Sequence, residues 1–540
     1  MAFLKIQKLK RDENGQILSG SAAIVEAVYH PEGKYHSSQQ VRERLGKVIT
    51  LAEDRKSGTF LSPTRGLVEY DVRTDTFTPV YRDDLNGRPV SVFPDPEIHT
   101  VFGDVYLLLK FLENRGFISL FRSVFQKKAE LERFLLHLLH GVLKDGSHIS
   151  CDDFTEKSYA SYLFRDIPAA SLHSDTAFFT MMGSDHLKMK FFRELIAMMR
   201  KRNPAFGKGC YVDSTPLPNA ISDNPFNALC CHGVSSSQIQ TRLVLVLDEE
   251  SGLPVWYDII PGNVLDLSTV MNIMNDVAVS LDIEIESLVL DAGYVCRPLI
   301  EAFHIGSPKS LISRMPARKG YPFKELYWKV KSMIDKGKYR FVREGHTYFG
   351  KRENISLFSD FREFAYVYVD FDNALLRFRE YLLEHEDEYR QLKARDQDWL
   401  TVKYGYFVLI SNIETTPEDL LSRYFCRTQI EGIFKTAKEY LQLLPLSKWT
   451  DVTVRGKILH DIINEIIFLE LRRSMETTGI SMNRLFGKTQ SLMCFKNKDN
   501  IAIIEVPNKT VKQFYKLLDI EVPNRVDIQK HSELLLAPNG

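Results

Sequence analysis

The sequence contains no apolar run of about 18 residues, the length that a transmembrane helix requires. Its first ten residues, MAFLKIQKLK, alternate like a strand and lack the apolar core of a signal peptide. We therefore expect a cytoplasmic protein with no membrane partner.

Cysteine is scarce and shows no metal-binding spacing. Seven cysteines are present, an odd number, and no two of them are spaced as C-x-x-C. This usage favours reduced thiols over a disulfide framework or a thiolate zinc site. What the chain does have is length and apolar content, because 540 residues with 44% hydrophobic residues are enough for about three or four domains with sizeable cores.

A net charge is also missing, because 70 Lys and Arg balance 70 Asp and Glu. The overall charge therefore gives no indication of a nucleic-acid partner, but its distribution does. From Arg314 to Glu353, twelve cationic residues stand against four acids, a net charge of +8 within 40 residues, and aromatic residues lie among them. This mixture is typical of a surface that follows a nucleic-acid backbone. The residues of this segment that we expect to contact DNA are Lys324, Trp328, Lys329, Lys331 and Arg340.

The hydrophobic period changes along the chain and predicts an α/β protein with six segments. We expect a β-rich N-terminal region at 1–95, a helical DNA-binding region at 96–205, the first part of a core at 206–314, a β-rich insertion with a later helix at 315–404, the second part of the core at 405–445, and a helical region at 446–540. The apolar faces of the last region could complete the core or form a dimer contact.

A basic helix is expected near the end of the second segment, at about residues 185–202. It combines an apolar face with Lys188, Lys190, Arg193, Arg200, Lys201 and Arg202. A solvated basic face and a phosphate-binding role are both open for these cations.

Two predicted strands of the core carry an aspartate at their ends. Asp213 follows a short β-type run and precedes two prolines, and Asp291 follows the apolar run 287–290 and precedes Ala and Gly. A strand, a turn, a second strand and a helix from about residue 266 lie between them. An isolated aspartate in such a position is usually a turn or cap residue. Two of them in one sheet suggest carboxylates that converge on one edge.

A third carboxylate lies on a predicted helix between two cations. The spacings of three, four and seven residues place Tyr424, Arg427, Glu431 and Lys438 on one helix face about 60° wide. The alternative is an ordinary amphipathic helix whose charges are solvated.

Together, Asp213, Asp291 and Glu431 form an all-oxygen ligand set that suits Mg²⁺ or Mn²⁺. Burying three carboxylates without a metal would be costly, because like charges repel and lose their hydration. Two ions about 3.5 to 4 Å apart would neutralise them and hold the attacking and leaving oxygens of a phosphodiester. Because the acids already supply a site for a hard metal, we expect single histidines such as His460 to be structural.

The helix matches the pattern Y-x2-R-x3-E-x6-K at every position, and the aspartates lie in Y-V-D-S-T and L-D-A-G. In these features the chain resembles bacterial insertion-sequence transposases of the DDE class. The resemblance implies an RNase H-like catalytic core, in which Asp213, Asp291 and Glu431 are catalytic and hold two Mg²⁺ (or Mn²⁺) ions. It also implies an endonuclease that cuts and joins strands in DNA transposition and recombination, with Tyr424, Arg427 and Lys438 on the phosphates of the bound end.

The partners that the resemblance implies are double-stranded DNA, both transposon ends and target DNA, and a second copy of the chain in a DNA-bound homodimer. The protein would act at the bacterial nucleoid. Transposases of this group can pass through a hairpin at the transposon end, and Trp328 is then the first candidate to stack on an extruded base. The alternative for Trp328 is packing against the core. For the whole chain, the alternatives are a catalytically silent DNA-binding regulator and a metal-dependent nuclease without strand transfer.

Overall fold

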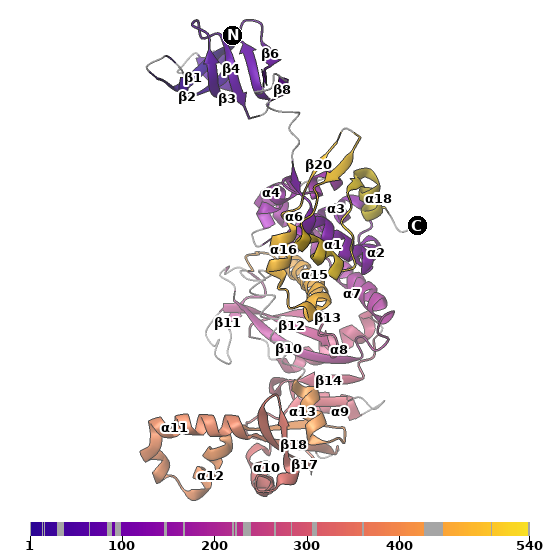
Figure 1. The fold of residues 1–540 in the computed structure, drawn as a ribbon. Helices are drawn as coiled ribbons and strands as arrows, with labels where there is room; N and C mark the ends of the chain where they lie inside the picture. Colours follow the sequence, from indigo (N-terminus) through magenta and orange to yellow (C-terminus); the bar gives the residue numbers. More distant parts are fainter. Residues whose placement is uncertain are drawn as a thin grey trace. The chain divides into compact units, whose positions relative to one another are not determined.

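The computed structural model describes residues 2–12, 15, 17–29, 37–63, 65–83, 89–91, 99–144, 148–165, 168–218, 221, 224–229, 239–263, 266–281, 283–304, 310–358, 361–425, 446–497 and 499–537. The fold is mixed α/β, and the chain divides into two units, Met1–His99 and Thr100–Gly540 (Figure 1). Among the described residues, no helix has both the length and the apolarity needed to cross a membrane.

The first unit is an antiparallel sheet in which each strand pairs with the next along the chain. Its strands are β1 (Ala2–Arg11), β2 (Ile17–Tyr29), β3 (Ser37–Leu51), β4 (Ser57–Ser62), β5 (Gly66–Asp71) and β6 (Thr76–Pro79), and a separate hairpin pairs β7 (Tyr81–Asp83) with β8 (Pro89–Ser91). Alternation along the strands turns Ile24, Leu45, Phe60 and Tyr70 to one face, where they form a core of their own.

The second unit begins with a helical layer. It contains α1 (Gly103–Asn114), α2 (Phe117–Val124), α3 (Lys128–Leu143), the 3₁₀ turn η1 (His148–Ser150), α4 (Cys151–Glu156), α5 (Ala160–Leu163), α6 (Leu172–Met182) and α7 (Asp185–Arg200). Apolar side chains at helical spacing, such as Leu131, Leu135 and Leu139 of α3, are almost completely buried. This burial accounts for the helical period that the sequence shows after residue 96.

Two cations of the basic face of α7 contact neighbouring elements of the second unit. Lys188 is half-buried, donates to the Tyr257 carbonyl at 2.7 Å, and lies 4.0 Å from the Trp256 ring centroid. Arg193 donates to the Ser280 carbonyl. Lys188 therefore helps to hold α7 against β13 and is not a solvated cation, whereas Arg193 is exposed and its phosphate-binding role stays a prediction.

The central feature of the second unit is a ten-stranded sheet. Its strands follow the order β11 (Ala228–Leu229), β12 (Ile239–Asp248), β10 (Gly209–Pro218), β14 (Ser287–Leu290), β15 (Ser310–Arg314), β19 (Tyr406–Ser411), β18 (Glu363–Asp370), β17 (His346–Ile355) and β16 (Arg340–Arg343), and β13 (Pro254–Pro261) pairs with β12. Strands β10, β14 and β15 are parallel to one another, and the other pairs are antiparallel. The connections between them include α8 (Asp266–Leu281), η2 (Ala292–Tyr294) and α9 (Arg297–His304).

The segment predicted as a β-rich insertion is built into this sheet. Strands β16, β17 and β18 join it through β19, so they extend the core sheet. The segment also contains α10 (Phe323–Val330), η3 (Lys331–Met333), η4 (Gly337–Tyr339), α11 (Phe371–Gln391) and α12 (Ala394–Lys403). The later helix expected in this segment is interrupted, because Leu392 and Lys393 adopt extended backbone angles. Helices α11 and α12 pack on each other (Figure 1).

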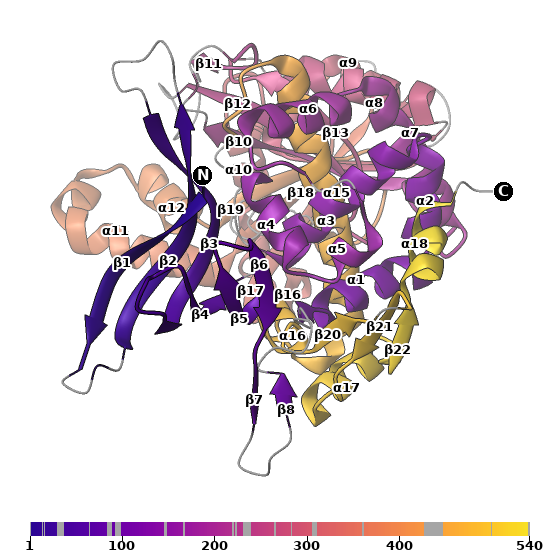
Figure 2. The same ribbon diagram turned by 90° about the horizontal axis from the view of Figure 1, so that it is seen from above.

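The C-terminal region is helical, as expected, but it also contains strands. Its elements are α15 (Asp451–Met475), η5 (Glu476–Thr478), α16 (Met482–Thr489), β20 (Met493–Lys496), β21 (Ile501–Ile504), α17 (Lys509–Leu517), β22 (Arg525–Asp527) and α18 (Ile528–Leu536). The three short strands form a sheet with β9 (Thr100–Val101), and α15 packs on α3 and α6 (Figure 2). This region therefore completes the core of the second unit.

Candidate active site

Asp213 and Asp291 lie side by side at one end of the parallel strands. Asp213 is in β10, and Asp291 follows the last residue of β14. The parallel register pairs Val212 with Leu290, so the two aspartates are the next residues on neighbouring strands. Adjacent strands are about 4.8 Å apart, which brings two carboxylates that are 78 residues apart in sequence to one sheet edge.

Both aspartates project from the sheet face that α13 (Pro417–Phe425) contacts. Tyr211 precedes Asp213 by two residues and therefore points to the same face, where its hydroxyl donates to the Arg423 carbonyl at 3.4 Å. Ser287 precedes Asp291 by four residues and therefore points to the same face of the sheet. Its hydroxyl accepts from the Arg423 guanidinium at 2.7 Å. The α13 backbone, Asp213 and Asp291 thus share one face of the sheet.

The local structure leaves each aspartate half-buried. Asp213 Oδ1 accepts from the backbone N–H of Ser214 at 2.8 Å. Asp291 is the N-cap residue of the short turn η2 and keeps an extended backbone, and its carbonyl accepts from the Ser313 hydroxyl at 3.2 Å. Two half-buried carboxylates at one edge offer an oxygen-only donor set, which fits a hard divalent cation.

The rest of the predicted site falls mainly outside the described residues. Arg427, Glu431 and Lys438 belong to 426–445, which the structure does not describe. Tyr424, the first residue of the pattern, is in α13 and only 7% exposed. Its ring lies 6.1 Å from that of Phe425, measured between centroids, so this tyrosine is packed at the C-terminal end of α13.

Two arginines that contact the strands of the aspartates were not singled out from the sequence. Arg423 donates to the hydroxyls of Ser287 and Ser310 and pairs with Glu249 at 3.4 Å, so it fastens α13 to the start of two parallel strands. Arg242 of β12 donates to the Ser214 hydroxyl, beside Asp213. The only sequence signal for Arg423 was its place next to Tyr424, and Arg242 gave none, because its neighbour comes from another strand.

The predicted DNA-binding residues of the insertion are described. Trp328 is half-buried in α10, with the Tyr327 ring at 4.9 Å and the Arg395 guanidinium 4.8 Å from its own ring centroid. Lys329 pairs with Glu353 at 3.0 Å, and Lys331 pairs with Asp398 at 2.6 Å.

The two remaining cations of that set, Lys324 and Arg340, are also exposed. Arg340 is the first residue of β16, and the Lys324 ammonium lies 5.2 Å from the centroid of the Trp399 ring. Acids from within the chain thus partly neutralise the basic segment. The bonds from Lys351 and Lys329 to Glu353 illustrate this, because they outweigh the effect of burial and lower the pKa of that carboxyl.

Comparison with known proteins gives one family. Residues 205–459 match the family described as "Transposase DDE domain", and this range contains both aspartates and α13. This match supports a DDE transposase. No curated protein matches the chain.

Among solved structures, the chain is similar to one described as "Cryo-EM structure of piggyBac transposase synaptic complex with hairpin DNA (SNHP)". The identity is 10%, the TM-score is 0.33, and the match covers 81% of this chain and 86% of the other.

Proposed function

We propose that this chain is a DDE transposase of a bacterial insertion sequence, which binds the terminal inverted repeats of its element, cuts DNA strands there and joins the ends to target DNA. The observation that carries the proposal is that Asp213 and Asp291 directly follow the paired residues Val212 and Leu290, on the sheet face that α13 contacts. The transposase DDE domain at residues 205–459 supports the same class of enzyme.

The catalytic core is proposed to be RNase H-like. In its support, three antiparallel strands, β13, β12 and β10, are followed by the parallel strands β14 and β15 on the other side of β10. Asp213 then lies in β10, the first strand of the core, and Asp291 follows β14, the first strand after the antiparallel part.

Glu431 is proposed as the third acid. A helix continued from Arg423 to Glu431 rises about 12 Å, and a strand from Ser287 to Asp291 rises about 13 Å. Because Arg423 is bonded to Ser287, Glu431 can reach the level of the aspartates on the same sheet face.

Asp213, Asp291 and Glu431 would hold two Mg²⁺ or Mn²⁺ ions. When bound, these cations supply Lewis-acid stabilisation of the attacking and leaving oxygens of a phosphodiester. Asp213 and Asp291 are fixed to neighbouring strands, so they would change position little during the reaction.

The chain's own cations would hold the DNA. Arg427 offers a planar fork to phosphate oxygens, and Lys438 offers a point charge. Arg242, beside Ser214, is a further candidate next to the first aspartate. Along the insertion, Lys324, Lys329, Lys331 and Arg340 are exposed cations, and Trp328 remains the proposed stacking partner for an extruded base.

The test is strand joining in vitro. Purified protein with Mg²⁺ is incubated with a labelled, pre-cut DNA end taken from the inverted repeats that flank the gene, together with a supercoiled target plasmid. A transposase transfers the label to the plasmid, and the DNA-bound protein sediments as a dimer.

The three functions that the chain could have give different results in this assay. Cutting of uncut ends without transfer of the label would indicate a metal-dependent nuclease. Specific binding without cutting, in Mg²⁺ and in Mn²⁺, would indicate a silent regulator. Either outcome would overturn the proposed function.

A further inference from the structure

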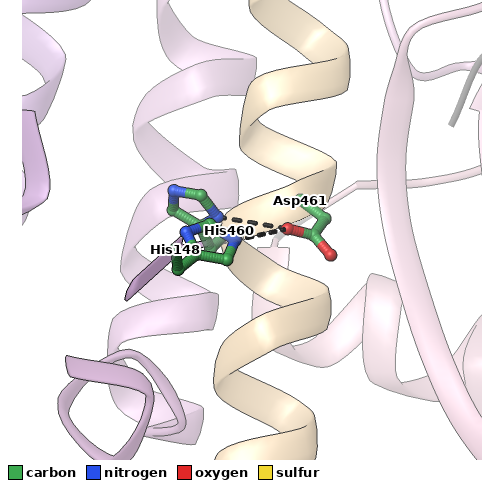
Figure 3. A group of neighbouring side chains, drawn as sticks. All are labelled: His148, His460 and Asp461. Carbon is green, nitrogen blue, oxygen red and sulfur yellow. Dashed lines mark hydrogen bonds and ion pairs between the residues drawn. The ribbon is translucent and has the colours of Figure 1, made fainter. Parts of the chain in front are cut away.

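A cluster of histidines lies within the second unit where η1 approaches α15. His148 comes from η1, and His460 and Asp461 are consecutive residues of α15 (Figure 3). Asp461 Oδ1 is 3.1 Å from His460 Nδ1 and 4.0 Å from His148 Nε2. One ligand atom from each of the three side chains lies within 4.8 Å of the other two.

The cluster is enclosed by packed helices. The His460 side chain is 0% exposed, that of Asp461 is 3% exposed, and that of His148 is 17% exposed, so His148 is the side from which an ion can enter. Phe179 of α6 closes another side, with its ring 5.0 Å from the His148 ring, measured between centroids. This environment excludes most water from the three ligand atoms.

Several polar atoms around the cluster have unmet hydrogen-bonding capacity. Among the described residues, no partner reaches His148 Nδ1, either ring nitrogen of His137, or His140 Nδ1. The His137 and His148 rings lie 5.7 Å apart, measured between centroids. Buried polar groups without partners are rare in native proteins and call for an explanation, such as a bound water or ion.

Two imidazole nitrogens and one carboxylate oxygen are a donor set typical of zinc. Around a tetrahedral zinc with bonds of about 2.0 Å, ligand atoms are about 3.3 Å apart, and the 3.1 and 4.0 Å separations bracket this value. The nitrogen ligands also give this cluster a different metal preference from the aspartates of the sheet, whose all-oxygen set suits magnesium or manganese.

Lys457 orients the carboxylate of Asp461. Its ammonium bonds to Asp461 Oδ2, so Oδ1 is left toward the two imidazoles. The positive charge opposes a dication nearby, which weakens the site. A buried network of hydrogen bonds and one ion pair, without any metal, is the competing explanation.

We propose that His148, His460 and Asp461 form a zinc site that ties η1 to α15, with water as the fourth ligand. The site would join the helical layer before the catalytic segment to the helix that follows it, and it is independent of the proposed transposase reaction. It also revises the expectation that His460 is only structural packing.

The test uses untagged full-length protein, stripped of metal with a chelator and dialysed. Zinc is added in the presence of excess Mg²⁺, and the bound metal is measured by mass spectrometry. The Asp213→Asn variant serves as the background, so that zinc at the sheet aspartates is not counted. We expect about one zinc per chain, and Co²⁺ in its place should give the intense visible absorption of tetrahedral coordination.

The variants are His148→Gln and, as the matched control, His186→Gln, which changes an exposed histidine of α7. His148→Gln should weaken zinc binding at least tenfold and remove the cobalt absorption, whereas His186→Gln should leave both unchanged. His148 is on a short turn and partly exposed, so its change is compatible with folding even if His460→Ala is not. Equal zinc binding by His148→Gln and wild type, or no stoichiometric zinc in the wild type, would overturn the proposal.

Discussion

Asp213 and Asp291 derive their proposed role from strand pairing, since each is the residue after a matched pair in two parallel strands. We predict that Asp291→Ala lowers the rate of strand cutting by about a thousandfold or more, equivalent to about 4 kcal/mol of transition-state stabilisation. Binding to end DNA and the thermal unfolding midpoint should change little, because this residue is half-buried at a sheet edge.

Gel-based cutting and filter-binding assays on the same preparation check this prediction. Asp276→Asn, at an exposed position of α8, is the control and should cut at the wild-type rate. Wild-type cutting by Asp291→Ala would remove this aspartate from the site.

Glu465 of α15 provides a prediction about pH. It is 3% exposed, and neither of its carboxylate oxygens has a hydrogen-bond partner among the described residues. Burial raises the pKa of this carboxyl from 4.5 to about 8. Between these two values, the folded protein keeps a proton that the unfolded chain loses, so this group makes stability fall as the pH rises.

The substitution Glu465→Gln removes that titration. We expect the variant to gain roughly 2 to 4 kcal/mol in free energy of unfolding over wild type between pH 5 and pH 8, because one pKa unit corresponds to about 1.4 kcal/mol. Denaturant unfolding at the two pH values measures the difference. Glu476→Gln, at an exposed position after α15, should show no such change, and a Glu465→Gln gain independent of pH would contradict the prediction.

At the scale of elements, Arg423 is one of the side chains that hold α13 to the sheet. Arg423 contacts Ser287 and Ser310 at the start of β14 and β15, and it pairs with Glu249. We predict that Arg423→Met lowers stability by about 1 to 3 kcal/mol and also lowers the cutting rate, because the helix that leads to Glu431 loses its anchor.

Arg423→Lys should restore only part of both losses, since an ammonium cannot reproduce the guanidinium fork. The control is Arg377→Met, an exposed arginine of α11 with 58% of its side chain accessible. Unfolding midpoints and cutting rates below the midpoint measure the two effects separately. If Arg423→Met had wild-type stability, α13 would not depend on this contact.

The helix pattern beyond α13 leads to a prediction about DNA binding. Arg427 and Lys438 share the predicted face with Glu431, whereas Lys435 lies away from its centre. Changing Arg427 or Lys438 to Ala should weaken binding to transposon ends more than Lys435→Ala, and each lost phosphate contact should reduce the log–log salt slope by about 0.9. Fluorescence anisotropy at several salt concentrations tests this, and equal slopes for all three variants would count against the shared face.

At the scale of the whole molecule, the two units have separate hydrophobic cores. The buried core residues of the first unit lie between Ala22 and Tyr70, and those of the large core lie from Phe102 onward. We predict that a fragment of residues 100–540 folds without the first unit and keeps its unfolding midpoint, because no side chain of its core is removed. Calorimetry of the fragment and of the full chain provides the measurement. Aggregation of the fragment, or a midpoint lowered by several degrees, would show that the units depend on each other.

Much of the fold could be predicted from local patterns. Helical spacing of leucines marked the helices after residue 96, and apolar runs marked β12, β13 and β14. Both strand-end aspartates were identified from the same runs. The short strands β20, β21 and β22 were missed, because segments of three or four residues show too little alternation to reveal a period.

The sequence by itself determined which residues alternate, which recur at helical spacing, and where acids follow apolar runs, since these are properties of neighbours along the chain. Only the tertiary structure decided that Asp213 and Asp291 lie on the face of α13, that the Lys188 ammonium contacts two aromatic rings, and that His148 meets His460. The physical reason is that strand register and helix packing are set by contacts between residues far apart in sequence. A local period carries no information about which distant partner a side chain meets.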